Sequence, residues 1–315
     1  MVNFTSGNTF LLMGFSDTRE VQILHAVLFL LIYLTALLGN LLIITLTTQD
    51  PRLHTPMYFF LRNLSFLDLC LISITVPKAI VSSLTSNNTI SFLGCMSQVF
   101  FFFLLATTEV ALLTVMSYDR YMAICHPLRY DTIMNHRACV QMAASSWASG
   151  GLNAILHTAA TFSIAMCGSP EVHQFFCDVP QLLSLACSYN IGELVVIGLS
   201  LMLDFGCFVF IDISYIHVFS TVLRMPSREG RSKAFSTCLP HLIVVTLFLS
   251  SGFFAYLHPL PKSPSLWDLL VSVFYTVVPP TMNPLIYSLR NKDMKVALGK
   301  LRVSIAHQTG RVNIT

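Results

Sequence analysis

The sequence predicts an all-α membrane protein, a seven-transmembrane helix bundle with its N-terminus outside the cell and its C-terminus in the cytoplasm. Composition is the first observation behind this prediction: 54% of the 315 residues are hydrophobic and only 10% are charged, whereas a soluble domain carries about 25% charged residues. The second observation is that apolar runs of about 20 residues recur along the chain, and each can cross about 30 Å of hydrocarbon.

Seven such runs follow one another and define the elements of the bundle. The first, third and fourth are the clearest, whereas charged residues weaken the second and the fifth. Prolines within the runs are compatible with spanning helices, because neighbouring helices re-satisfy the backbone groups that a proline frees. The predicted spans are 25–48, 57–80, 97–118, 138–160, 195–222, 237–258 and 267–289. They divide the chain into an extracellular N-terminus (1–24), the bundle (25–289) and a cytoplasmic tail (290–315).

The distribution of basic residues predicts the orientation. With the N-terminus outside, only Arg19, Lys78 and Lys262 of the 18 Lys and Arg residues lie on the outer side, as the positive-inside rule requires. The basic inner loops would face anionic lipid, so the net charge of +3 requires no nucleic-acid partner. Residues 1–23 lack the basic start and apolar block of a cleavable signal, and we expect the first span to direct insertion.

Two features of the outer segments indicate modification. Asn3-Phe-Thr and Asn87-Asn-Thr are glycosylation sequons; Asn3 is the expected site, and Asn87 is the weaker one because its loop is short and close to the bilayer. Four cysteines also lie outside, where the oxidising environment favours two disulfides, and the sequence alone leaves three connectivities open. These cysteines are Cys95, Cys167, Cys177 and Cys187.

One stretch carries the strongest indication of function. Residues 116–130 read MSYDRYMAICHPLRY, which puts Asp119 and Arg120 where the third apolar run meets water. The stretch resembles the Asp-Arg-Tyr box of rhodopsin-like G-protein-coupled receptors, in the extended form typical of odorant receptors. Shorter matches to the same family cover about residues 10–300: Gly39-Asn40, PMYFFL at 56–61, Ser214-Tyr215, KAFSTC at 233–238 and PTMNPLIY at 280–287.

The resemblance implies an odorant receptor of the plasma membrane. Such a receptor binds a small, mostly apolar volatile ligand within the bundle and activates a stimulatory olfactory-type heterotrimeric G protein, which raises cyclic AMP. The resemblance also selects the disulfides Cys95–Cys177 and Cys167–Cys187. It assigns G-protein coupling and switching to Asp119, Arg120, Tyr121, Tyr215, Asn283, Pro284 and Tyr287.

The predicted ligand site lies in the outer half of the bundle. Aromatic residues and then small and hydroxylated ones follow each other along the third span, and a concave site of this kind encloses a mostly apolar molecule with one or two hydrogen bonds. With helical spacing taken into account, the favoured lining residues are Phe102, Phe103, Ala106, Leu199, Leu203, Gly252, Phe253, Tyr256 and Thr276. No lysine or arginine lies at this depth, so a strongly anionic ligand is disfavoured.

The sixth span departs from the family pattern. It reads Phe248-Leu249-Ser250 where the family usually has Phe-Tyr-Gly. The aromatic hydroxyl expected at the floor of the pocket is therefore missing, which puts its usual part in coupling in doubt. Tyr256, two turns further out, is the candidate to replace it in part.

Acidic residues inside the spans are costly in lipid and mark function. Asp68 and Glu109 lie at similar depth in the second and third spans and can share a cation or a proton; the resemblance implies a sodium ion, and no other cofactor is expected. A packing role for protonated acids stays open as well. Asp204 could border the ligand cavity or serve as an internal hydrogen-bonding group.

Two other function classes fit the sequence poorly. A transporter predicts internal repeats and paired broken helices, and no repeat is found in the sequence. An intramembrane enzyme predicts a nucleophile with a base, and neither Gly-x-Ser-x-Gly nor His-Glu-x-x-His is present. The sequence therefore predicts a receptor, not an enzyme, although a chemosensory role outside the nose stays open.

Overall fold

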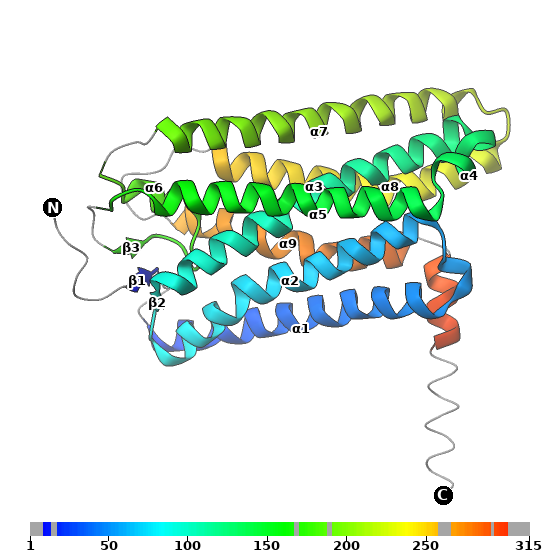
Figure 1. The fold of residues 1–315 in the computed structure, drawn as a ribbon. Helices are drawn as coiled ribbons and strands as arrows, with labels where there is room; N and C mark the ends of the chain where they lie inside the picture. The colour runs from blue at the N-terminus through cyan, green and yellow to red at the C-terminus, as the bar shows by residue number, and fades with distance from the viewer. Residues whose placement is uncertain are drawn as a thin grey trace, which may run out of the picture.

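The computed structural model describes residues 9–13, 18–166, 170–187, 191–257, 266–290 and 293–301. Within these ranges seven long helices lie side by side as a bundle (Figure 1). Their bounds are α1 (Arg19–Gln49), α2 (Pro56–Thr85), α3 (Phe92–Cys125), α5 (His136–Phe162), α7 (Ile191–Arg224), α8 (Arg228–Leu257) and α9 (Leu266–Arg290). Each predicted span corresponds to one of these helices, and most helices continue beyond the predicted apolar segment.

The ranking of the spans was partly wrong. Six of the seven long helices are long and apolar enough to cross a membrane, and α5, one of the three expected to be clearest, is the exception. By contrast α7, which was expected to be weak, is second only to α1 in mean hydropathy. The low hydropathy of α5 comes from polar residues such as Gln141, Asn153 and His157 and from several Gly, Ser and Thr. Small residues of this kind let membrane helices approach closely.

Gly150 shows how close that approach is. A Cβ atom at Gly150 would lie 2.2 Å from the Oγ1 of Thr108 and 2.5 Å from the backbone oxygen of Leu104, both on α3. The neighbouring Gly151 has no such restriction, since its Cβ would first meet a side-chain atom at 4.0 Å. α3 also packs against α2, α7 and α8, and is therefore the central helix of the bundle.

The first helix is attached to the last at the Gly39-Asn40 motif. The Nδ2 of Asn40 donates to the backbone oxygen of Pro280 at 2.9 Å. A Cβ at Gly39 would lie 2.8 Å from the Cβ of Pro284, so only glycine fits there without a shift. The motif thus fixes α1 against the proline-containing half of α9.

Side chains mark several of the helix ends. Ser91 begins α3 by accepting from the backbone N–H of Gly94 at 3.1 Å, and Asn135 begins α5 in the same way with Ala138 at 3.0 Å. Such N-caps satisfy backbone donors that have no partner within the helix. At the end of α2 the guanidinium of Arg19 donates to the backbone oxygen of Leu84 at 2.7 Å, which attaches the start of α1 to the end of α2.

A small sheet at one end of the bundle was not predicted from the sequence. Its strands are β1 (Thr9–Leu12), β2 (Thr89–Ser91) and β3 (Glu171–Val172), in the order β2-β1-β3 (Figure 1). β1 pairs antiparallel with β2 and parallel with β3. The segment before the first span is therefore part of the folded domain over these residues. We call the end with the sheet the outer end, following the predicted orientation.

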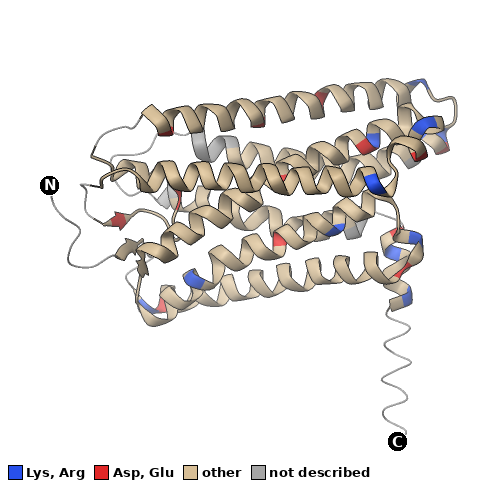
Figure 2. Cartoon of the chain, viewed as in Figure 1, with Lys and Arg blue, Asp and Glu red and all other residues tan. Residues whose placement is uncertain are grey.

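The inner end holds the short helices η1 (Pro51–Leu53), η2 (Pro127–Arg129) and α4 (Tyr130–Ile133). Residues 293–301 are also helical, and the Nζ of Lys300 lies 3.1 Å from the Oδ2 of Asp50. Most of the coloured Lys and Arg residues gather at this end (Figure 2). This is the distribution that the positive-inside rule associates with the cytoplasmic face, and the orientation itself stays a prediction.

Candidate ligand cavity and inner switch

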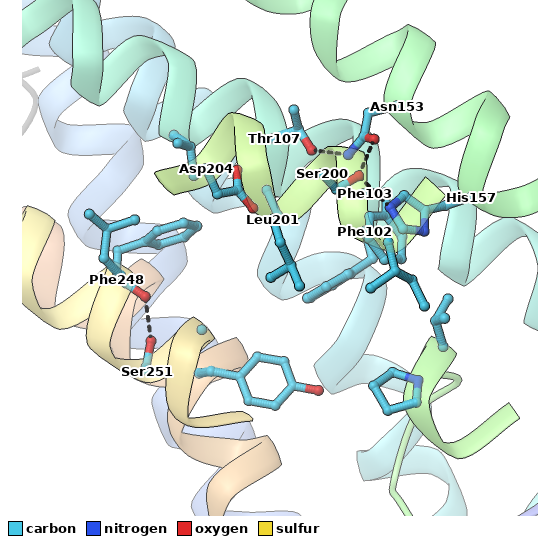
Figure 3. A pocket seen from close by; sticks show the side chains of 18 of the residues that line it. Phe102, Phe103, Thr107, Asn153, His157, Ser200, Leu201, Asp204, Phe248 and Ser251 are labelled. Carbon is cyan, nitrogen blue, oxygen red and sulfur yellow. Dashed lines mark hydrogen bonds between the residues drawn. The ribbon is translucent and has the colours of Figure 1, made fainter. Parts of the chain in front are cut away.

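A cavity of about 290 Å³ lies within the outer half of the bundle (Figure 3). Side chains of α3, α5, α7, α8 and α9 form its walls, together with Leu71 of α2, and α6 (Val179–Ser184) contributes residues at the outer side. Most of the lining is apolar, with the rings of Phe102, Phe103, Phe248 and Tyr275 among it. A small, mostly apolar and aromatic site of this kind is the usual form of a ligand pocket.

The predicted ligand residues are partly placed at this cavity. Phe102, Phe103, Ala106 and Gly252 line it. The side chains of Phe253 and Tyr256 lie outside the described residues. Thr276 is buried but donates to the backbone oxygen of Ser272 at 2.6 Å, and its neighbour Tyr275 lines the cavity instead.

The assignment of Leu199 and Leu203 was wrong. They are 61% and 50% exposed and lie on the outside of the bundle, where a lipid surface would cover them. The cavity face of α7 consists of Ile197, Ser200, Leu201 and Asp204, which follow the i, i+3, i+4, i+7 spacing of one helix face. The error is a rotation of the helix about its axis.

A chain of four polar side chains forms one wall of the cavity and was not predicted from the sequence. The Nδ2 of Asn153 donates to the Oγ1 of Thr107, and the Oγ of Ser200 donates to the Oδ1 of Asn153, both at 2.8 Å. Ser200 then accepts from the Nε2 of His157 at 2.8 Å, which leaves the Nδ1 of His157 buried without a partner among the described residues. The His157 ring stacks on Phe103, with centroids 3.9 Å apart. The only indication of this polar chain in the sequence was the presence of polar residues inside apolar spans.

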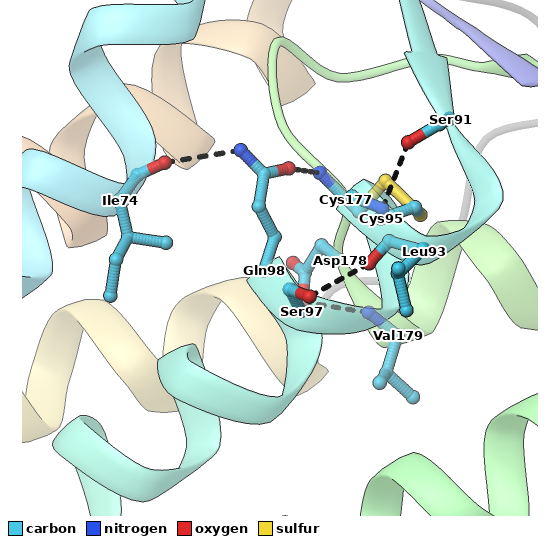
Figure 4. Close-up of a disulfide and its surroundings, with 10 residues drawn as sticks. Ile74, Ser91, Leu93, Cys95, Ser97, Gln98, Cys177, Asp178 and Val179 are labelled. Carbon is cyan, nitrogen blue, oxygen red and sulfur yellow. Dashed lines mark hydrogen bonds between the residues drawn. A yellow bond between two sulfur atoms is a disulfide. The ribbon is translucent and has the colours of Figure 1, made fainter.

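The outer loop above the cavity is attached to α3 by the predicted disulfide Cys95–Cys177 (Figure 4). Beside it the Oε1 of Gln98 accepts from the backbone N–H of Cys177 at 3.0 Å, and its Nε2 donates to the backbone oxygen of Ile74 at 3.1 Å. Gln98 thus joins the loop to both α2 and α3. Cys187 is disulfide-bonded as well, and its predicted partner Cys167 lies outside the described residues.

Asp178 connects the same loop to α9. Its Oδ1 accepts from the backbone N–H of Val179 at 2.9 Å and begins α6, and its Oδ2 accepts from the hydroxyl of Tyr275. Since Tyr275 lines the cavity, this contact fixes the outer wall of the site.

The glycosylation sequons lie at the outer end. Asn87 is exposed between α2 and β2, and its Oδ1 accepts from the hydroxyl of Thr89 at 2.7 Å. Asn3 lies outside the described residues. Glycosylation at either residue stays a prediction.

At the inner end Asp119 is fully buried and forms an ion pair with Arg120, whose Nε lies 2.9 Å from the Oδ2. The hydroxyl of Tyr130 in α4 donates to the Oδ1 at 2.7 Å. Burial and the neighbouring Asp119 raise the pKa of Tyr130, so this hydroxyl keeps its proton. Arg120 is therefore held against its own helix, while Tyr121 bonds to His126 at 2.9 Å.

The remaining switch residues surround this pair. The hydroxyl of Tyr215 on α7 lies 2.6 Å from the Nδ1 of His241 on α8, a partner that was not predicted from the sequence. Tyr287 is 1% exposed, and its hydroxyl has no hydrogen-bond partner within the described ranges. Pro284 packs against α1 as described above. Tyr215 and Tyr287 thus take no part in holding Arg120 in this arrangement.

Asp68 and Glu109 form the polar centre of the bundle. Both are fully buried, and the Nδ2 of Asn283 donates to both carboxylate oxygens of Asp68 at 3.1 Å. Both carboxylate oxygens of Glu109 and the Oδ1 of Asn283 are buried without a hydrogen-bond partner in the part of the chain that is described. Oxygen donors of this kind fit a hard cation. No group of three or more His, Cys, Asp or Glu side chains gathers in that part, so such an ion would depend on two carboxylates and an amide.

Comparisons with known proteins agree with this geometry. The olfactory receptor family model matches residues 29–304. Olfactory receptor 14A16 of Homo sapiens is 63% identical over 302 residues, covering 96% of this chain and 97% of the relative. Olfactory receptor 14J1 of Homo sapiens is 59% identical, with coverage of 96% and 94%.

A solved structure shows the same fold. Squid rhodopsin superposes with a TM-score of 0.72 over 90% of this chain and 81% of that chain, at 19% sequence identity. The family match covers most of the chain, and the relatives match it over nearly their whole length. The chain therefore belongs to the olfactory receptor family, and it is a multi-pass G-protein-coupled odorant receptor and not an enzyme.

Proposed function

We propose that this receptor binds a small, mostly apolar volatile ligand in the cavity beneath α6. We further propose that binding activates a stimulatory olfactory-type G protein at the plasma membrane and raises cyclic AMP. The observation that carries the proposal is the cavity itself, which touches six of the long helices and is lined mainly by apolar and aromatic side chains.

The lining suits such a ligand. Aromatic rings on α3, α8 and α9 supply apolar contact area, and the polar chain from Thr107 to His157 offers hydrogen bonds at one wall. The described lining contains neither lysine nor arginine, which supports the expectation that a strongly anionic ligand is disfavoured.

Helix α8 offers the connection to the inner end. It lines the cavity with Phe248, Leu249 and Ser251, and seven residues earlier than Phe248 it carries His241, the partner of Tyr215. Two helical turns, about 10.5 Å, separate these two points, which lie on nearly the same face of the helix. A ligand that contacts α8 differently in two arrangements of the bundle shifts the equilibrium between them. Leu249 takes part through its packing, since it lacks the hydroxyl that the family usually has there.

The arrangement with Arg120 paired to Asp119 is the resting one in this proposal. Activation releases Arg120 toward the G protein, and Tyr215 and Tyr287 move toward it. Glu109 and Asp68 hold either a sodium ion or a shared proton in the resting arrangement. The carboxylate oxygens of Glu109 and the Oδ1 of Asn283, which are buried without a hydrogen-bond partner among the described residues, support this part of the proposal.

The test is a panel of volatile compounds applied to cells that express the receptor, with cyclic AMP as the readout and surface receptor counted by antibody. We expect at least one apolar compound to raise cyclic AMP, and Arg120→Ala to abolish that response while the receptor still reaches the surface. A full response from well-expressed Arg120→Ala would contradict the assigned role of Arg120. A response through another second messenger would contradict the assigned G protein.

A further inference from the structure

Asp204 on α7 is the one charged side chain among the described residues that line the cavity. It occupies the cavity face of α7 together with Ile197, Ser200 and Leu201, and Figure 3 shows its carboxylate on the wall of the cavity near Leu201. Ile197 and Leu201 on the same face are apolar, and Ser200 is the polar neighbour. Asp204 is thus an acid in an apolar site within the membrane, where such residues are rare and usually functional.

The carboxylate of Asp204 forms no hydrogen bond or ion pair with any side chain that the structure describes. Ser200, one turn away, already donates to Asn153 and accepts from His157. The polar chain from Thr107 to His157 is thus complete without Asp204, although Ser200 belongs to the same face of α7. Asp204 is half-buried. A charge that is partly removed from water is costly unless it is paired, and the described lining provides no lysine or arginine to pair with it.

We propose that the partner of Asp204 is the ligand, and that the ligand is a small protonated amine with an apolar body. The ammonium group would pair with the Asp204 carboxylate. The body would lie against the rings of Phe102, Phe103 and Phe248, whose faces also attract cations. This inference rests on the proposed function of the cavity and adds the head group of the ligand to it.

The cavity limits the size of the amine. Its volume of about 290 Å³ suits a compact aliphatic or alicyclic molecule. The negative charge of Asp204 favours an amine over a carboxylic acid as the head group of the ligand. An amine gains an ion pair, whereas a carboxylate would bring a second negative charge next to Asp204, and like charges at close range repel.

The experiment compares head groups on a constant body. Wild-type receptor is exposed to heptylamine, heptanol, heptanal and heptanoic acid, and to the corresponding cyclohexyl compounds, with cyclic AMP as one readout. The thermal stability of the purified full-length receptor in the presence of each compound is the second readout, which requires no G protein. We expect the amines to be the strongest ligands of each set in both measurements.

Asp204→Asn then tests the ion pair, because it keeps the shape of the side chain and removes its charge. The half-maximal concentration of the amine should rise about 30-fold or more, as is typical when one partner of a buried charge pair is removed. Asp212→Asn is the matched control: it makes the same change eight residues further along α7, at an exposed position, and should change the value by no more than about twofold.

The outcomes separate this inference from the function on which it rests. Alcohols or aldehydes that activate the receptor while amines neither activate nor stabilise it would overturn the amine inference and leave the odorant function intact. An amine response that is unchanged in Asp204→Asn would also overturn the amine inference alone. So would a weaker response of Asp204→Asn to the alcohols and aldehydes only, because Asp204 would then act as a neutral hydrogen-bond donor. A surface-expressed receptor that neither responds to nor is stabilised by any compound would overturn both.

Discussion

At the scale of single residues, Tyr130 offers a direct test of the inner switch. Its hydroxyl is the second partner of the buried Asp119, and a hydrogen bond to a charged group contributes about 1.5–3 kcal/mol. Tyr130→Phe removes the donor and leaves one carboxylate oxygen without a partner in the resting arrangement. We therefore expect ligand-independent cyclic AMP to rise several-fold per surface receptor.

Tyr118→Phe is the control for this change. Tyr118 lies one residue before Asp119, and its hydroxyl has no hydrogen bond to any described residue, so its loss should leave basal signalling unchanged. Equal basal activity in Tyr130→Phe and wild type would show that the Tyr130 bond does not restrain Arg120.

The residues of the inner switch could be predicted because their motifs are short and contiguous. Asp119-Arg120 and Asn283-Pro284 are each formed by adjacent residues, so these motifs can be recognised in a single sequence. His241 could not be predicted in this way, since its role depends on Tyr215, which lies 26 residues earlier on another helix. The roles of Asn153 and His157 could not be predicted for the same reason, because their hydrogen-bond partners are on α3 and α7.

At the scale of helices, the contact between α3 and α5 depends on Gly150. Gly150→Ala would put a methyl group against a backbone oxygen of α3, and backbone cannot move aside as a flexible side chain can. Overpacking of this kind costs about 1–3 kcal/mol, so we expect a lower melting temperature of the purified receptor and less receptor at the cell surface.

Gly151→Ala provides a matched control on the same helix. Its added methyl group meets nothing closer than 4.0 Å, and alanine favours a helix over glycine by up to about 1 kcal/mol. Its melting temperature should equal or exceed that of the wild type. If both substitutions destabilise the receptor equally, the close approach of α5 to α3 is wrong.

Helix positions could be predicted from the sequence, whereas helix rotation and the outer sheet could not. A span needs only length and hydropathy, but α7 is apolar on nearly every side, and a helix of that kind gives no periodic signal for its inner face. Leu199 and Leu201 are therefore indistinguishable in sequence, although only Leu201 faces the cavity. The strands have two to four residues and pair across distant parts of the chain. No local sequence pattern therefore predicts them.

At the scale of the whole molecule, α2, α3 and α9 meet at Asp68, Glu109 and Asn283. Two ionised carboxylates at close range repel unless a cation or a proton lies between them. A sodium ion would favour the compact resting bundle, because it needs oxygen donors from several helices at once. A shared proton would make the two acids titrate as a coupled pair.

Asp68→Asn and Glu109→Gln should each change basal signalling under either explanation, since both remove a charge from the centre of the bundle. Only the sodium explanation predicts that the basal activity of the wild type falls when sodium replaces a bulky inert cation at constant ionic strength. The measurement is G-protein activation in membrane preparations, where both faces of the receptor meet the same ions. Each variant serves as the control for the other, because loss of either carboxylate should abolish the sodium response. If basal activity is indifferent to sodium while both variants are altered, sodium is eliminated and the shared-proton explanation remains.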